Sequence, residues 1–213
     1  MQTVGGTPAR YSALLNGALP NGTEVYATIL TYPFTVQGEA LPAGQGPNIL
    51  KRVSQVVAPI TSSAFTIREA VLSDKTKSAV LTRFIAAMYA ANKLLLNTAS
   101  KPCAIQAIAA QLQVSNSVAS AEYDSVVDAV TGEVSPDGMF GVNPTGIMND
   151  VVVRQRFGGF ASVPAGFDFA GALIPGPGRL IDYSIRDAAV ALYESHPVLG
   201  NCTLRCRVKG PEL

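Results

Sequence analysis

The chain has 213 residues, of which 48% are hydrophobic and 15% charged, and its formal net charge is +1. These proportions are typical of a folded chain with one large domain or two small lobes, and they argue against intrinsic disorder. A net charge near zero gives no electrostatic basis for binding nucleic acid, so no nucleic-acid partner is expected. The apolar stretch 79–96 is interrupted by Thr82, Arg83 and Lys93, so no membrane-spanning helix is predicted.

The first residues contain no secretion signal, because residues 1–4 have neither a basic segment nor an apolar core. The sequence reaches Gly5 and Gly6 at once, as if it began at the end of a strand. We therefore expect the chain to lack the N-terminal part of a longer protein.

Few residues are available for metal or redox chemistry. The chain has one histidine, His196, and three cysteines, Cys103, Cys202 and Cys206. A zinc site needs about four such ligands at suitable spacing, so no metal site and no cofactor are predicted. We expect Cys103 to be a small core residue on an apolar helix face. Whether Cys202 and Cys206 pair is left open.

The first predicted element is a helix over residues 7–17. Thr7 is suited to the N-cap, Pro8 to the first helical position and Gly17 to the left-handed residue that ends the helix.

A strand is predicted next, over residues 24–30, because β-branched and aromatic residues are frequent there. Pro33 ends its pairing, and a Gly- and Pro-rich loop covers residues 38–48. Further strand-like segments are predicted at residues 50–57, 64–68 and, in part, 160–179.

The second half of the chain is predicted to be mainly helical. Asp74 is suited to cap a helix over residues 75–97, and Ser115 or Ser117 to cap one over residues 118–129. Other helices are predicted at residues 101–114, 146–157 and 181–193. A helix and a strand followed by further strands and helices is the order typical of an α/β protein.

Two segments are candidates for binding a ligand. Gly5, Gly6 and Thr7 precede a helix, so close backbone approach and free amides there favour an anion, although Pro8 removes one donor. A plain strand-to-helix turn explains the same residues.

The second candidate segment contains Thr31, Tyr32 and Phe34 and follows the predicted strand. Ligands lie at the carboxyl edge of open α/β sheets, where such rings would stack and hydroxyls would orient the ligand. A packed crossing between two lobes is the alternative.

Catalytic patterns are weak by comparison. His196 lies beside Pro197 in a polar tail, and no Gly-x-Ser-x-Gly motif is present. Asp124 and Asp128 share one helix face, which is more typical of a solvated surface than of acid–base chemistry. We therefore expect a protein that is not an enzyme.

The residues around both candidate segments resemble a known family, the solute-binding proteins of nitrate, sulfonate and taurine ABC importers, which also includes the thiamine-pyrimidine-synthesis proteins of fungi. The resemblance covers about residues 4–187 and departs from the family at the usual Asp, where Tyr26 or Glu24 stands. It is carried by residues 5–17, 26–34, 63–70, 84–95, 123–124 and 156–159.

This resemblance implies a partial type II periplasmic-binding-protein fold of class α/β. Residues 1–35 would be the remnant of one lobe, and residues 36–213 most of the other lobe. A small organic or anionic solute would bind weakly in a cleft between the lobes, and ABC-transporter membrane subunits are the implied partners. Unpaired strand edges would favour self-association. The family is periplasmic or membrane-associated, whereas the missing signal is consistent with the cytoplasm.

Two alternatives remain open at this point. One is a thiamine-pyrimidine-precursor synthase, although no matching histidine or cysteine cluster is present. The other is a structural remnant that binds no ligand.

Overall fold

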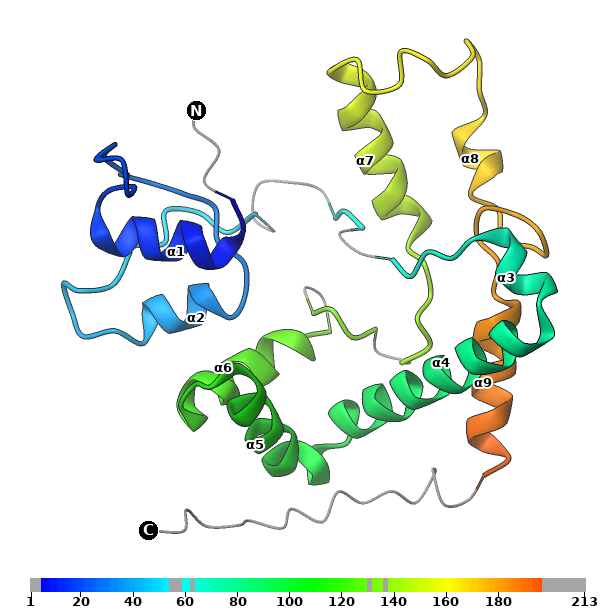
Figure 1. Cartoon of the computed structure of the whole chain (residues 1–213), viewed down its shortest axis with the longest axis horizontal. Helices are drawn as coiled ribbons and strands as arrows, with labels where there is room; N and C mark the ends of the chain where they lie inside the picture. Colours follow the sequence, from blue (N-terminus) through cyan, green and yellow to red (C-terminus); the bar gives the residue numbers. More distant parts are fainter. Residues whose placement is uncertain (1–4, 54–58, 62–63, 130–131, 136–137, 197–213) are drawn as a thin grey trace.

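The computed structural model describes residues 5–53, 59–61, 64–129, 132–135 and 138–196, and within these residues the fold is helical (Figure 1). The only β-type pairing among them is an isolated antiparallel bridge between Ala18 and Glu24. The helices are α1 (Thr7–Asn16), α2 (Phe34–Glu39), α3 (Glu69–Ser73), α4 (Lys75–Leu96), the short 3₁₀ helix η2 (Thr98–Ser100), α5 (Lys101–Leu112), α6 (Asn116–Val126), α7 (Pro144–Arg156), α8 (Phe169–Ala172) and α9 (Ser184–Glu194).

The predicted α/β periplasmic-binding fold is therefore wrong. Residues 24–30 form no ladder, and Tyr26 and Ile29 are 84% and 66% exposed. Residues 50–53, 64–68 and 160–179 also contain no strand, while residues 54–58 and 62–63 lie outside the described part. β-Propensity reflects fit to a pleated, half-buried surface, so it produces no strand where no neighbouring strand supplies that surface.

The predicted helices are confirmed in type, with small shifts at their ends. Asp74 caps α4 by accepting hydrogen bonds from the backbone N–H groups of Thr76 and Lys77, and Ser115 caps α6 in the same way. The Lys77 ammonium, 2.9 Å from Asp74 Oδ2, and then the backbone hydrogen bond from Lys77 lower the pKa of the Asp74 carboxyl. Gly17 ends α1 in the left-handed conformation, as predicted. The N-cap of α1 is Gly6, so the predicted role of Thr7 as the cap is wrong.

The main hydrophobic contact joins α4 to α9, which cross in Figure 1. Ile85 and Ala86 of α4 pack against Ala189 of α9, with Leu81, Phe140, Ile185 and Leu192 around them. The Tyr89 and Tyr193 rings meet edge to face at 5.0 Å. Small side chains at the crossing let the two helices approach closely enough for the larger neighbours to interlock.

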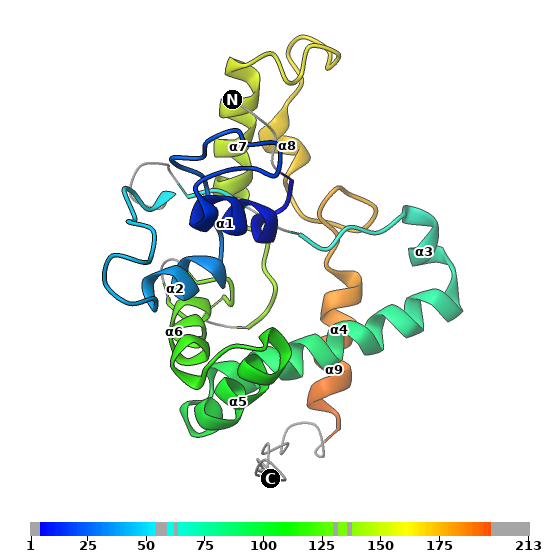
Figure 2. The same ribbon diagram turned by 60° about the vertical axis from the view of Figure 1, so that its left-hand side comes forward.

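A second contact joins α5 to α6 and continues to α2, which lies beside α6 in Figure 2. Tyr123 of α6 donates its hydroxyl proton to the backbone carbonyl of Leu95. Lys101 pairs with Asp124 at 2.6 Å. These contacts connect the end of α4 through α6 to α2 and α1.

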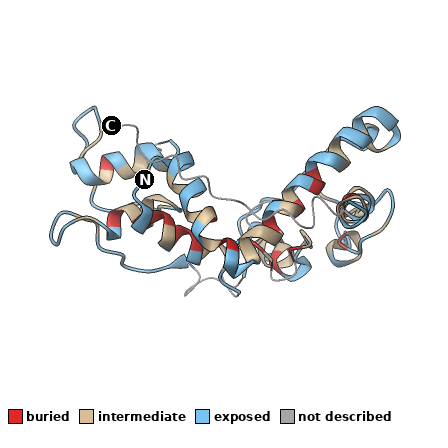
Figure 3. Ribbon diagram, turned by 90° about the horizontal axis from the view of Figure 1, so that it is seen from below, coloured by how far each residue is buried: buried red, intermediate tan, exposed pale blue. Residues whose placement is uncertain are grey.

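Burial is sparse along these helices, as Figure 3 shows. No large side chain of the described residues is less than 2% exposed. Even α4, with 22 residues, contains only four buried ones: Ile85, Ala86, Tyr89 and Asn92.

By length and composition alone, α4 is also apolar enough to cross a membrane. A core helix of a soluble protein can meet the same criteria, and α4 packs against α9. Contrary to the prediction, the sequence by itself does not exclude a membrane-spanning helix.

Cys103 on α5 is half-buried and disulfide-bonded, so the expectation of a core thiol is wrong. Cys202 and Cys206 lie outside the described residues. The division of the chain at residue 35 stays a prediction, although α2 crosses that position.

The α4–α9 contact generates a stability prediction. Ala189 is fully buried, so Ala189→Leu should overpack the crossing and lower the free energy of unfolding by about 1–3 kcal/mol, measured by urea denaturation. Ala188→Leu on the exposed side of α9 is the matched control and should change it by less than about 0.5 kcal/mol. Equal effects of the two substitutions would contradict the packing described here.

Candidate functional site

The two predicted ligand-binding segments lie side by side in the structure. The Thr7 hydroxyl, in the first turn of α1, is 3.2 Å from the Thr31 hydroxyl, 24 residues away in the sequence. The Tyr11 and Phe34 rings pack against each other with their centroids 5.4 Å apart. Segments predicted separately from the sequence therefore form one site, which we call the Thr7–Thr31 site.

The backbone around Thr7 leaves donors free at the start of α1. Gly5 has φ +85°, a left-handed conformation that favours glycine, and Gly6 is the N-cap. No side chain caps the helix, so within the described residues the Thr7 and Ala9 N–H groups have no acceptor. Unpaired N–H groups and the helix dipole together favour an anion at this end.

Arg10 supplies a positive charge to the same place. Its Nη2 donates a 3.0 Å hydrogen bond to Thr7 Oγ1, while its Nε is buried and has no hydrogen-bond partner among the described residues. The four salt bridges found among the described residues use other cations: Arg52, Lys77, Lys101 and Arg186. The terminal N–H groups of a guanidinium without a carboxylate partner favour binding an anion.

Hydrogen bonds link Arg10, Thr7 and Thr31 into one chain. Thr7 Oγ1 accepts from Arg10, and either hydroxyl can donate in the pair between Thr7 and Thr31. When Thr7 donates to Thr31, the Thr31 proton is free to point to a ligand.

The other predicted site residues lie at the edge of this arrangement. Tyr32 is 38% exposed and follows Thr31 directly. Phe34 begins α2 and packs against Tyr11, where partial burial raises the pKa of the Tyr11 phenol. Sequence reasoning missed the Arg10 side chain, although a cation three residues after Thr7 on a helix lies on the same face.

The residues considered for catalysis are not brought together. His196 Nδ1 lies 2.8 Å from the Leu192 carbonyl and 3.2 Å from the Ser195 hydroxyl, at the end of α9. Asp124 is exposed and paired with Lys101. No group of three His, Cys, Asp or Glu side chains in the described part of the chain is arranged to hold a metal ion.

Comparison with protein-family models, with curated proteins and with solved structures finds no match for this chain. The resemblance to solute-binding proteins of ABC importers therefore stays a prediction from the sequence.

One further acid has an unusual environment. Glu122 on α6 is 9% exposed, and its Oε2 is buried with no hydrogen-bond partner among the described residues. Loss of solvation raises the pKa of the Glu122 carboxyl, and the negative charge of Glu133 raises it further. A buried unpaired carboxylate is costly, so the charged form of Glu122 destabilises the fold.

This environment predicts a pH-dependent stability. The pKa of Glu122 is higher in the folded chain than in the unfolded chain. The charge on Glu122 therefore does not destabilise the fold below the unfolded pKa, which is about 4.3, and it destabilises the fold fully above the folded pKa. Glu122→Gln should therefore raise the Tm at pH 7, with the gain disappearing at acidic pH, as measured by circular dichroism. Glu133→Gln should give a smaller gain. A Tm difference for Glu122→Gln that does not change with pH would contradict this assignment.

Proposed function

We propose that the Thr7–Thr31 site of this chain binds a small organic anion and that the site contacts the anion's charged group. The observation that supports this most directly is the guanidinium of Arg10, which is hydrogen-bonded to Thr7 and has no carboxylate partner among the described residues. An anionic oxygen would accept from the terminal N–H groups of this guanidinium and from the Thr31 hydroxyl, while the free N–H groups of Thr7 and Ala9 add to the attraction.

The proposal keeps the predicted class of ligand but changes the form of the site. A cleft between two α/β lobes has no basis in a helical fold, so the ligand would bind at the surface where α1 meets the Thr31 segment. Tyr32, which is partly exposed, is positioned beside Thr31 to contact the organic part of the ligand.

The charged group that suits this site is a sulfonate, phosphate or carboxylate. A planar guanidinium can donate two parallel hydrogen bonds to any of these groups. The site is half-exposed, so we expect modest affinity that falls as the salt concentration rises.

Delivery of the ligand to ABC-transporter membrane subunits is proposed from the resemblance alone. Self-association also stays a prediction, but the strand edges on which it was based are not found in the described residues. No observation in the structure favours the synthase alternative over ligand binding.

The proposal predicts the effect of removing the charge. Arg10→Met keeps the apolar stem but loses the guanidinium, so it should weaken benzenesulfonate binding by at least about tenfold in isothermal titration calorimetry at low salt. Thr31→Val, which loses only the hydroxyl, should weaken it about threefold to tenfold.

The matched control is Arg83→Met on the exposed surface of α4, which makes the same change in net charge elsewhere. It should bind benzenesulfonate like the unaltered chain. Equal losses in Arg10→Met and Arg83→Met would show a nonspecific charge effect. If benzenesulfonate, phosphate and acetate all fail to bind the unaltered chain, the proposal is wrong.

A further inference from the structure

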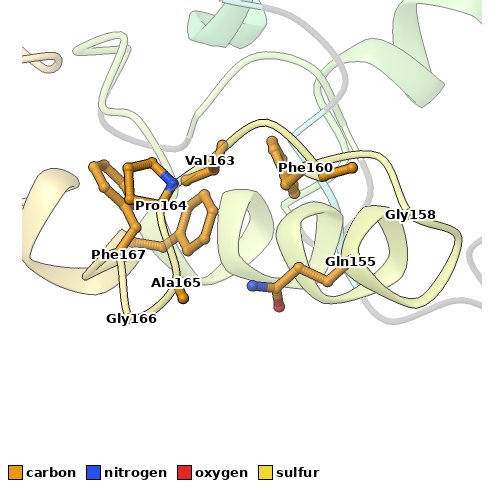
Figure 4. Close-up of a pocket in the computed structure, with 10 residues that line it drawn as sticks. Gln155, Gly158, Phe160, Val163, Pro164, Ala165, Gly166 and Phe167 are labelled. Atoms are coloured by element: carbon orange, nitrogen blue, oxygen red, sulfur yellow. The ribbon is translucent and has the colours of Figure 1, made fainter.

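We propose a second binding site, for a neutral planar aromatic compound, in the loop between α7 and α8. It is separate from the Thr7–Thr31 site and rests on different residues. The loop encloses a hollow of about 400 Å³ that is open to solvent on one side (Figure 4). This volume is within the range of about 300–1,000 Å³ typical of small-molecule sites.

The lining of the hollow is about equally polar and apolar, and its apolar part includes three aromatic rings. The Phe169 ring lies 5.0 Å from Phe160 and 4.8 Å from Phe167, measured between ring centroids. Val163 and Pro164 complete the apolar lining. The Phe169 ring thus connects the other two, and together they form a wall on which a flat ligand can stack or pack edge to face.

The loop is held in shape by local interactions. Gly158 and Gly166 adopt left-handed conformations, with φ +73° and +80°, at the two turns of the loop. The Val163 N–H donates to the Phe160 carbonyl at 3.0 Å, and Asp168 caps α8 by accepting from the Gly171 N–H at 2.8 Å. The walls therefore do not depend on a distant part of the chain for their position.

The polar groups at the hollow favour an uncharged ligand. No charged residue lines it, so no ion pair within the lining would compensate a buried charge. The Gln155 side chain, which reaches toward the hollow from α7 in Figure 4, can both donate and accept a hydrogen bond. A planar ring with one carbonyl, amide or amine group fits these features.

Arg154 supports the wall from outside. Its guanidinium lies over the Phe160 ring, 5.9 Å from the centroid, and Arg154 is not part of the lining. This cation–π contact helps to fix the ring orientation. The positive charge beside the wall also disfavours a cationic ligand.

The test uses the neutral fluorescent probe N-phenyl-1-naphthylamine, whose emission rises in an apolar site. The chain has no tryptophan, so energy transfer from tryptophan does not complicate the signal. We expect one equivalent of probe to bind, and Phe160→Ala and Phe167→Ala to weaken binding about fivefold or more. Binding of several equivalents with no dependence on these rings would overturn the proposal.

Two further variants keep the result interpretable. Ala165→Phe should fill the hollow and weaken binding without removing any wall, which covers the case in which Phe160→Ala fails to fold. Phe157→Ala removes a ring that is 80% exposed, in the same segment but outside the lining, and should bind like the unaltered chain. Unchanged binding in Ala165→Phe, or an equal loss in Phe157→Ala, would contradict the site.

Arg10→Met should leave probe binding unchanged, which separates this proposal from the anion site.

Discussion

The contact between α4 and α9 is the interaction on which the rest of the structure depends. Ala86 and Ala189 are small enough to let the two helices meet, and Ile85 fills the space beside them. The C-terminal end of α4 continues through η2 into α5 and α6, and α6 contacts α2. Along the sequence, α9 comes after α8 and the loop that contains the aromatic hollow. With so little of the chain buried elsewhere, losing this contact would remove the largest apolar cluster of the described residues.

Because the core is sparse, the two proposed binding sites are held mainly by local interactions. In the Thr7–Thr31 site, one helix start, one guanidinium and two hydroxyls are held by hydrogen bonds of 3.0 and 3.2 Å. In the α7–α8 loop, two left-handed glycines and a capped helix hold three rings in contact. Each arrangement offers a specific chemical group: a guanidinium without a carboxylate partner among the described residues in the first, and uncharged aromatic rings in the second.

The sequence predicted the parts of this fold that local chemistry determines. Asp74, Ser115 and Gly17 mark helix ends because each acts on backbone groups within a few residues. The strand predictions are wrong because strand pairing depends on segments that are distant in the sequence. The β-propensity of a segment carries no information about those distant segments. The sequence proposes Thr7 and Thr31 as parts of two separate candidate segments, whereas their proximity and the position of the Arg10 guanidinium beside them depend on the fold. The hollow could not be predicted, because its shape depends on how the loop turns between Phe160 and Phe169.

The central claim is that Arg10 and the start of α1 bind an anionic group directly. The most direct measurement is a two-dimensional ¹H–¹⁵N NMR titration with benzenesulfonate, in which the Arg10 Nε–H resonance reports on the electronic environment of the guanidinium. We expect this resonance to shift together with the Thr7 and Ala9 backbone amides, along one saturable binding curve. Shifts confined to other residues, with the Arg10 Nε–H resonance unchanged at saturation, would contradict the account.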